Sequence, residues 1–137
     1  MSHEKNETLS LQIDFSKLKE ISSLTEEVLP CAVQNADTKE VLNVAYVNRK
    51  ALEHSFKTGN ATFWSTSRNE LWIKGATSGD ELKIEDIRVN CEQNSLLYRV
   101  RLVGKGACHT KDGSGISRRS CYYRQITEST ELSFVQR

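Results

Sequence analysis

The sequence lacks any long apolar segment, any internal repeat and any low-complexity linker. No apolar run approaches the roughly 20 residues that a membrane-spanning helix needs, so we expect no membrane partner. No signal peptide precedes Met1-Ser2-His3, which favours a cytoplasmic location. The length of 137 residues indicates one domain with a small core.

Aromatic residues are few, 7% of the chain, and they form no stacking stripe among the basic residues. This pattern argues against nucleic-acid binding, because single strands are held by stacking on aromatic rings beside basic groups. Positive charge nevertheless clusters: residues 97–124 hold seven Lys or Arg and one acidic residue, Asp112. The excess suits a phosphate-bearing ligand. A solvated sheet face is the alternative, above all for Arg99 and Arg101 at alternating positions.

The four cysteines are dispersed and include no C-x-x-C pair. Without a secretory signal they fit a reducing compartment, where thiols stay available for metal. Cys91, Cys108 and Cys121 lie in one stretch dense in Arg and Lys, which predicts convergence on one zinc ion with an open fourth position. Their separations of 17 and 13 positions are weak evidence alone, so three buried small side chains are the alternative. Cys31 is expected in the core.

Two further motifs indicate catalysis or ligand binding. His109 directly follows Cys108 in a glycine-containing loop, which favours a role in catalysis over an exposed residue with none. Upstream, the hydroxyls of residues 65–67 stand near Arg68 and Lys74 and glycines, which indicates a phosphate cradle or, alternatively, a surface hairpin. Trp72, which lies between Arg68 and Lys74 in the sequence, suits either stacking on a base or packing in the core.

The periodicity predicts an α+β fold with a mostly antiparallel β-sheet and one or two short helices. A short amphipathic helix or two is expected within residues 14–27. A second helix is expected over 49–57, begun by Asn48, ended by Gly59, and buried along Ala51, Leu52, Ser55 and Phe56. The expected strands are 29–36, 41–48, 61–65, 82–91, 96–104 and 121–126. Residues 90–95 form the turn that presents Cys91.

The expected organisation has three parts. Residues 1–28 form a polar, partly helical extension, residues 29–128 form the domain, and residues 129–137 form a tail.

Five segments resemble the phosphoribosyl-AMP cyclohydrolase family. LNVAYVNRKAL, STSRNELWIKGATSGD, NCEQN, ACHT and RRSCYYR occur in the order of that family, over roughly residues 29–126. LWIKGATSG and the ACHT…SC pair are the most specific of them. The resemblance implies hydrolysis of the N1–C6 bond of the adenine ring in N1-(5-phosphoribosyl)-AMP, the third step of histidine biosynthesis. It also implies a homodimer whose zinc is held by three cysteines drawn from both subunits.

The resemblance assigns roles to residues of this sequence. Cys91, Cys108 and Cys121 are the implied zinc ligands, shared across the dimer, and His109 is the candidate general base or proton shuttle. The implied substrate surface is larger and comprises Ser67, Arg68, Trp72, Lys74, Gly75, Ser78, Gly79, Arg118 and Arg119. Of these, Arg68, Lys74, Arg118 and Arg119 are expected to hold phosphates.

The sequence departs from the family pattern at two places. The D-C-D-x-D motif for Mg²⁺ reads NCEQN, so Asn90, Glu92 and Asn94 supply one negative charge instead of three, and Mg²⁺ depends on that charge. Between the last two cysteines, residues 111–116 lengthen a usually short link, and we expect a mobile loop there. Three alternatives therefore stay open: a paralogue acting on another purine nucleotide, a non-catalytic zinc-binding protein, and an enzyme in which Glu92 and substrate phosphates still capture Mg²⁺.

Overall fold

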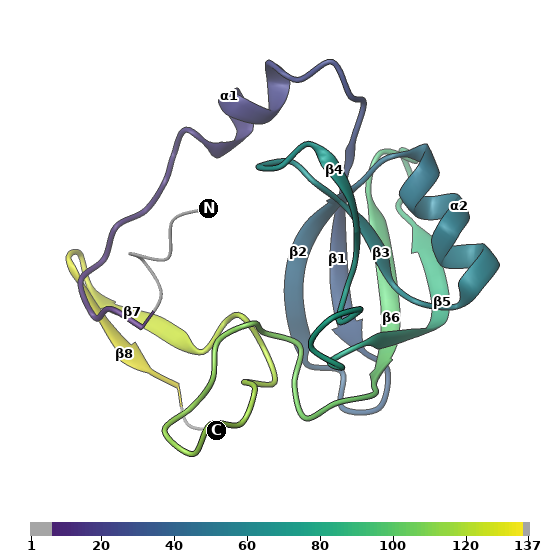
Figure 1. Cartoon of the computed structure of the whole chain (residues 1–137). Helices are drawn as coiled ribbons and strands as arrows, with labels where there is room; N and C mark the ends of the chain where they lie inside the picture. The colour runs from purple at the N-terminus through teal and green to yellow at the C-terminus, as the bar shows by residue number, and fades with distance from the viewer. Residues whose placement is uncertain (1–6, 136–137) are drawn as a thin grey trace.

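A computed structural model describes residues 7–135 and confirms an α+β architecture with a mostly antiparallel sheet (Figure 1). In chain order the elements are α1 (Lys17–Ser22), β1 (Leu29–Asn35), β2 (Val41–Val47), α2 (Arg49–Thr58), β3 (Thr62–Ser65), β4 (Glu70–Ile73), β5 (Leu82–Val89), β6 (Leu96–Leu102), β7 (Arg124–Glu128) and β8 (Glu131–Phe134). Neither helix of this described part is long and apolar enough to cross a membrane.

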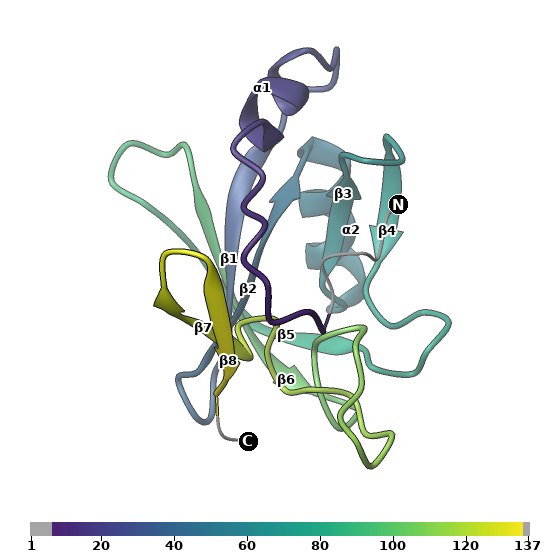
Figure 2. The ribbon, with the colours of Figure 1, turned by 90° about the vertical axis from the view of Figure 1, so that its left-hand side faces the viewer.

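Four strands form the central sheet in the order β2-β1-β6-β5. The pairs β1–β2 and β5–β6 are antiparallel, and β1 and β6 are parallel neighbours at its centre. Strands β3 and β4 form a separate hairpin, as do β7 and β8. Figure 2 shows α2, β3 and β4 together on one side of β1 and β2, and the β7–β8 hairpin on the other.

Helix α2 begins and ends where the sequence predicts. The side chain of Asn48 accepts a hydrogen bond from the Ala51 N–H at 2.8 Å, and Gly59 ends the helix in the left-handed region at φ 75°. Ala51 and Ser55 are buried as expected, but Phe56 is 69% exposed, so its predicted burial is wrong. Phe56 directly follows Ser55 around the helix, which turns its side chain off the buried face.

The core lies between the sheet, α2 and the β3–β4 hairpin, and it includes Cys31 as expected. A polar node sits inside it: the Ser55 hydroxyl donates to the Tyr98 hydroxyl at 3.2 Å and accepts from the Thr62 N–H at 2.9 Å. Burial raises the pKa of the Cys31 thiol to about 12 and also raises the pKa of Tyr98, so both groups stay neutral.

The ends of the described chain differ from expectation. The helix expected within residues 14–27 covers only α1, six residues without a buried side chain. The last expected strand begins three residues late, at Arg124, and a further strand, β8, follows in the segment expected as a tail. The residues around Ser10 pair with β8, since the Leu11 N–H donates to the Thr130 carbonyl and the Leu132 N–H donates to the Leu9 carbonyl, both at 2.9 Å.

Candidate functional site

Two of the three candidate ligand cysteines meet in the loop between β6 and β7. Cys108 is buried and Cys121 is half-buried, and their thiols hydrogen-bond each other. The Cys108 sulfur also lies 3.0 Å from the Thr110 hydroxyl. The bond from Cys121 lowers the pKa of the Cys108 thiol, while the same bond and burial raise the pKa of Cys121. One sulfur of the pair is therefore readily ionised, which suits a soft metal such as zinc.

Backbone hydrogen bonds build the corner that holds this pair. The Cys108 N–H donates to the Arg118 carbonyl and the Arg118 N–H donates to the Thr110 carbonyl, both at 3.0 Å. The Cys121 N–H donates to the Leu42 carbonyl at 2.9 Å, which ties the corner to β2. A side chain at Gly106 would overlap the carbonyl of Arg118, so the close approach of the two segments requires glycine there.

A hollow of about 460 Å³ is lined by most of the predicted substrate residues. His109 and Lys111 lie at one side of it, and β4 with the loop after it lines the rest. The predicted members that line it are Arg68, Trp72, Lys74, Gly75, Ser78 and His109.

A smaller hollow of about 60 Å³ lies beside this space. It shares Trp72, Lys74 and His109 with the larger hollow, and Cys121 lies in its wall. His109 thus lines both the hollow beside Cys121 and the larger space for a ligand.

Lys74 is the most buried cation of the hollow, with 8% of its surface exposed. Its ammonium donates to the Asp80 carbonyl at 3.2 Å. Burial lowers its pKa, opposed by the negative charge of Asp80 and of the thiols of Cys121 and Cys108. Lys74 therefore sets a positive charge close to the cysteine pair as well as at the hollow.

The other predicted residues of segment 67–79 include some that line the hollow and two that do not. Trp72 is half-buried and packs against Phe63, with ring centroids 5.8 Å apart, so it combines core packing with a place in the wall. Gly75 adopts φ 80°, and a side chain there would overlap the backbone of Asp80. Two predicted residues are not in the wall: the hydroxyl of Ser67 lies 3.5 Å from that of Ser65, and the Gly79 N–H donates to the Gly75 carbonyl.

The two arginines before Cys121 lie outside the hollow. Arg118 is only 6% exposed, and its guanidinium makes two hydrogen bonds to the carboxylate of Glu7, at 2.7 and 3.2 Å. The same group lies over the rings of Tyr123 and Phe134, at 4.2 and 5.2 Å from their centres. Arg119 is exposed and lies 3.4 Å from Glu40. Arg118 therefore braces the corner, and sequence reasoning did not detect its partner.

Cys91 is exposed on the turn between β5 and β6 and does not meet the thiol pair. Within residues 7–135, no three Cys, His, Asp or Glu side chains gather in a metal-binding group. The three predicted ligands consequently do not converge inside one chain.

The turn that carries Cys91 is closed by its own amides. The Asn90 side-chain oxygen accepts from the N–H groups of Asn94 and Ser95, both at 2.9 Å. Its amide nitrogen donates to the side-chain oxygen of Asn94 at 2.7 Å. Glu92 contributes the only charge of the motif and is exposed. Because both amide oxygens already accept hydrogen bonds, this donor set does not fit Mg²⁺.

The inserted segment after Thr110 is a closed turn. The Asp112 N–H donates to the Ile116 carbonyl at 2.9 Å, and the Asp112 carboxylate accepts from the N–H groups of Ser114 and Ile116. Lys111 and Ser117 pair across its base. The segment expected as a mobile loop is thus a hydrogen-bonded hairpin.

Seven residues that line the hollow were not among the predicted site residues, and two of them, Asp80 and Lys111, join the hollow to the inserted hairpin. Asp80 accepts a hydrogen bond from the Ser117 hydroxyl at 2.6 Å, which links the loop after β4 to the inserted hairpin. The signal for Asp80 was its position at the end of the specific segment LWIKGATSGD. The sequence signal for Lys111 is only its membership of the basic cluster in residues 97–124, because its place at the hollow depends on the closure of the hairpin.

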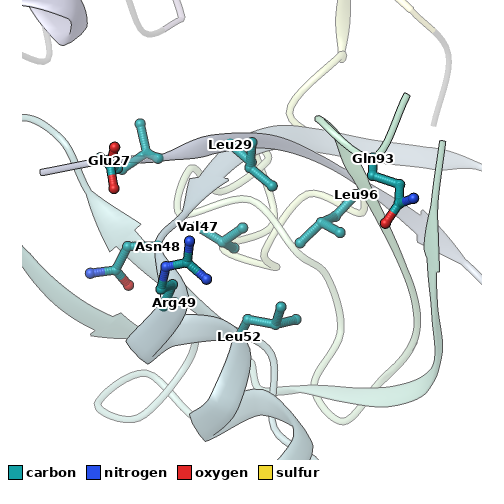
Figure 3. A pocket seen from close by; sticks show the side chains of 9 residues that line it. Glu27, Leu29, Val47, Asn48, Arg49, Leu52, Gln93 and Leu96 are labelled. Atoms are coloured by element: carbon teal, nitrogen blue, oxygen red, sulfur yellow. The ribbon is translucent and has the colours of Figure 1, made fainter. Parts of the chain in front are cut away.

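A further hollow, of about 370 Å³, lies near the start of α2 and contains no predicted site residue (Figure 3). The apolar side chains of Leu29, Val47, Leu52 and Leu96 face it, with Gln93 of the Cys91 turn at its border. Its polar lining consists of Glu27, Asn48, Arg49 and Gln93, and it includes neither His109 nor a cysteine. The candidate site is therefore the hollow beside His109.

Comparisons with known proteins identify the family of the chain. A sequence model described as phosphoribosyl-AMP cyclohydrolase matches residues 43–123. The phosphoribosyl-AMP cyclohydrolase of Desulfatibacillum aliphaticivorans is 39% identical over 91% of this chain and 89% of its own length. Those of Hyphomonas neptunium and Methanosarcina barkeri are 45% and 47% identical, over 79% and 86% of this chain and 76% and 83% of their own lengths. On its sequence, the chain belongs to the phosphoribosyl-AMP cyclohydrolase family.

Proposed function

We propose that this protein hydrolyses the N1–C6 bond of the adenine ring of N1-(5-phosphoribosyl)-AMP, the third step of histidine biosynthesis. The observation that carries the proposal is the position of His109, which lines both the hollow and the smaller space beside Cys121. The family membership and the names of the relatives support the same reaction.

The proposed cofactor is zinc, held by Cys108 and Cys121 of one chain and by Cys91 of a second chain in a homodimer. The adjacent thiols of the first two supply two soft ligands, and the exposed turn leaves Cys91 accessible to another copy. Zinc at such a site supplies Lewis acidity that lowers the pKa of a water molecule. All four cysteines are free thiols, which suits the cytoplasm as the proposed location.

The residues of this chain have separate roles in the proposed reaction. Arg68 and Lys74 hold phosphate, and the wall around Trp72 receives the adenine. His109 accepts a proton from the water whose oxygen attacks C6, and it returns a proton to N1 as the N1–C6 bond breaks. The other proton of the water ends on the exocyclic nitrogen, so that C6 becomes a carboxamide.

Magnesium has no part in this proposal. The amide oxygens of Asn90 and Asn94 are used inside the turn, and Glu92 alone brings charge. We propose that the protein works without Mg²⁺ at this motif.

The test is the initial rate of ring opening by the zinc-loaded protein, with Mg²⁺ titrated from zero. We expect turnover that does not depend on Mg²⁺. His109→Ala should retain zinc and lower kcat about 10²-fold or more, the usual contribution of general acid–base catalysis. An unchanged rate would remove His109 from the mechanism. A zinc-loaded protein without turnover would instead favour a paralogue with another purine nucleotide substrate, or a zinc-binding protein without catalysis.

A further inference from the structure

The hairpin inserted after Thr110 brings a cation to the proposed substrate site. Lys111 stands at its base, opposite Ser117, and lines the same hollow as Arg68, Lys74 and His109. The hydrogen bonds to Asp112 close the hairpin, so the place of Lys111 is fixed by the fold of the insertion.

The base of the hairpin is anchored to the far wall of the hollow. The Ser117 side chain is 7% exposed, and its hydroxyl donates to the Asp80 carboxylate at 2.6 Å. The same hydroxyl accepts from the Lys111 ammonium at 3.3 Å. Asp80 in turn lies against Gly75 and Gly104, where a side chain would overlap it. Lys111 is thereby positioned through Ser117 by residues on two sides of the hollow.

The three cationic side chains of the hollow differ in the groups that contact their positive charges. The guanidinium of Arg68 lies 3.5 Å from the Glu70 carboxylate. The ammonium of Lys74 is largely buried, bonded to the Asp80 carbonyl, and close to the thiols. Lys111 is exposed, and the bond that holds it is to an uncharged hydroxyl. A charge-assisted bond to an incoming phosphate is therefore most favourable at Lys111.

We infer that Lys111 is a phosphate-binding residue of this hollow and makes the protein select a nucleotide with two phosphate groups over one with a single phosphate. The inference rests on the proposed function, because N1-(5-phosphoribosyl)-AMP carries one phosphate on each ribose. The inserted hairpin then acts as a specificity element.

The experiment compares the zinc-loaded parent protein with Lys111→Gln, Lys111→Arg and Lys105→Gln. Lys105 is an exposed lysine of the same loop that does not line the hollow, so its variant controls for a general change in charge. Ring-opening kinetics are measured with the full substrate and with two analogues, each lacking one of the phosphates.

We expect Lys111→Gln to raise KM for the full substrate about tenfold, with kcat unchanged, since a charge-assisted contact contributes on that scale. For the analogue that lacks the phosphate bound by Lys111, the variant and its parent should have the same KM. Lys111→Arg should retain KM within about threefold, and Lys105→Gln should match the parent. Equal KM values for parent and Lys111→Gln on all three substrates would overturn the inference, as would equal increases on all three.

A binding measurement keeps this inference separate from the proposed reaction. Calorimetric titration of the same proteins with AMP and with ribose 5-phosphate reports phosphate binding without turnover. If the parent does not open phosphoribosyl-AMP but Lys111→Gln weakens one of these ligands about tenfold, the proposed function fails and the role of Lys111 stands. If neither ligand distinguishes Lys111→Gln from its parent, the role of Lys111 is excluded.

Discussion

Cys91 and the Cys108–Cys121 pair lie in opposite kinds of surroundings. The turn around Cys91 is closed by hydrogen bonds within six residues, 90–95, and it leaves the thiol exposed. The pair lies in a corner assembled from distant parts of the chain, including Glu7, Leu42 and Arg118. One half of the proposed metal site is therefore a local structure that is exposed to a partner chain, whereas the other half forms only when distant parts of the chain have packed together.

The largest effect is expected from the removal of one member of the Cys108–Cys121 pair. Cys108→Ser should abolish activity and zinc content together, because a hydroxyl is a poor replacement for a thiolate ligand of zinc. Zinc is measured by atomic absorption on the purified protein. Activity that persists in a variant without zinc would refute the assignment of this corner as the metal site.

A mixture of two inactive variants tests whether the two halves of the proposed metal site come from different chains. Cys91→Ser and Cys108→Ser should each be inactive, but a mixture refolded together forms heterodimers with one intact set of ligands. With random pairing in a two-fold dimer, half of the dimers are mixed and half of their sites are complete, so roughly a quarter of the parent activity should return. Activity is measured across mixing ratios. No recovery at any ratio would contradict a site shared between chains.

Removal of the ion pair between Glu7 and Arg118 tests the half of the proposed metal site that depends on distant parts of the chain. Glu7→Ala leaves the buried guanidinium of Arg118 without its carboxylate, so the free energy of unfolding should fall by about 1–2 kcal/mol. The expected loss of stability is small because the Glu7 side chain is 42% exposed, so water partly replaces the carboxylate as a partner of Arg118. Chemical denaturation measures the change.

The pair Arg119–Glu40, in which the arginine side chain is 54% exposed, provides the matched control for this brace. Glu40→Ala should change the free energy of unfolding by less than about 0.5 kcal/mol, as is usual for surface ion pairs. Equal effects of the two substitutions would mean that the Glu7 contact does not brace the corner.

Among changes to the proposed metal site and its brace, the smallest effect is expected in the turn around Cys91. In the double variant Asn90→Asp, Asn94→Asp, two carboxylates replace amides that hydrogen-bond at 2.7 Å, so the turn should lose about 1 kcal/mol through like-charge repulsion. Mg²⁺ should restore that stability and should not affect the parent protein. Denaturation curves with and without Mg²⁺ measure both, with Glu92→Gln as the control. A double variant as stable as its parent in the absence of Mg²⁺ would show that the amide bond does not close the turn.

Local patterns in the sequence predicted α2, β3 and the four strands of the sheet, whereas β4 and β8 were not among the expected strands. Asn48 and Gly59 fixed the ends of α2, and alternating apolar residues located the four strands of the sheet. The parallel pairing of β1 with β6 was not predictable, because strand periodicity identifies a strand and not its neighbour. The burial of Phe56 was predicted wrongly because the buried face of α2 is narrower than its apolar pattern.

The candidate site was predictable where family motifs cover it. Arg68, Trp72, Lys74 and Ser78 meet His109 at the hollow, as the motifs imply. The structural position of Arg118 was not predictable, since its carboxylate partner lies 111 residues away along the chain. The motifs provide residue identities, and only the packing of distant segments determines which of them reach the hollow.

The brace between Glu7 and Arg118 also has a consequence for the order of folding. A contact that closes a loop of this length has a large entropic cost and forms only after other interactions have brought its ends together. We therefore expect the Cys91 turn to form early with the β5–β6 hairpin and the corner around Cys108 to form late. In the folded protein, we expect the backbone amides of the corner to exchange with solvent more readily than those of the sheet, and the same local opening would give the proposed zinc ion access to the thiols of Cys108 and Cys121.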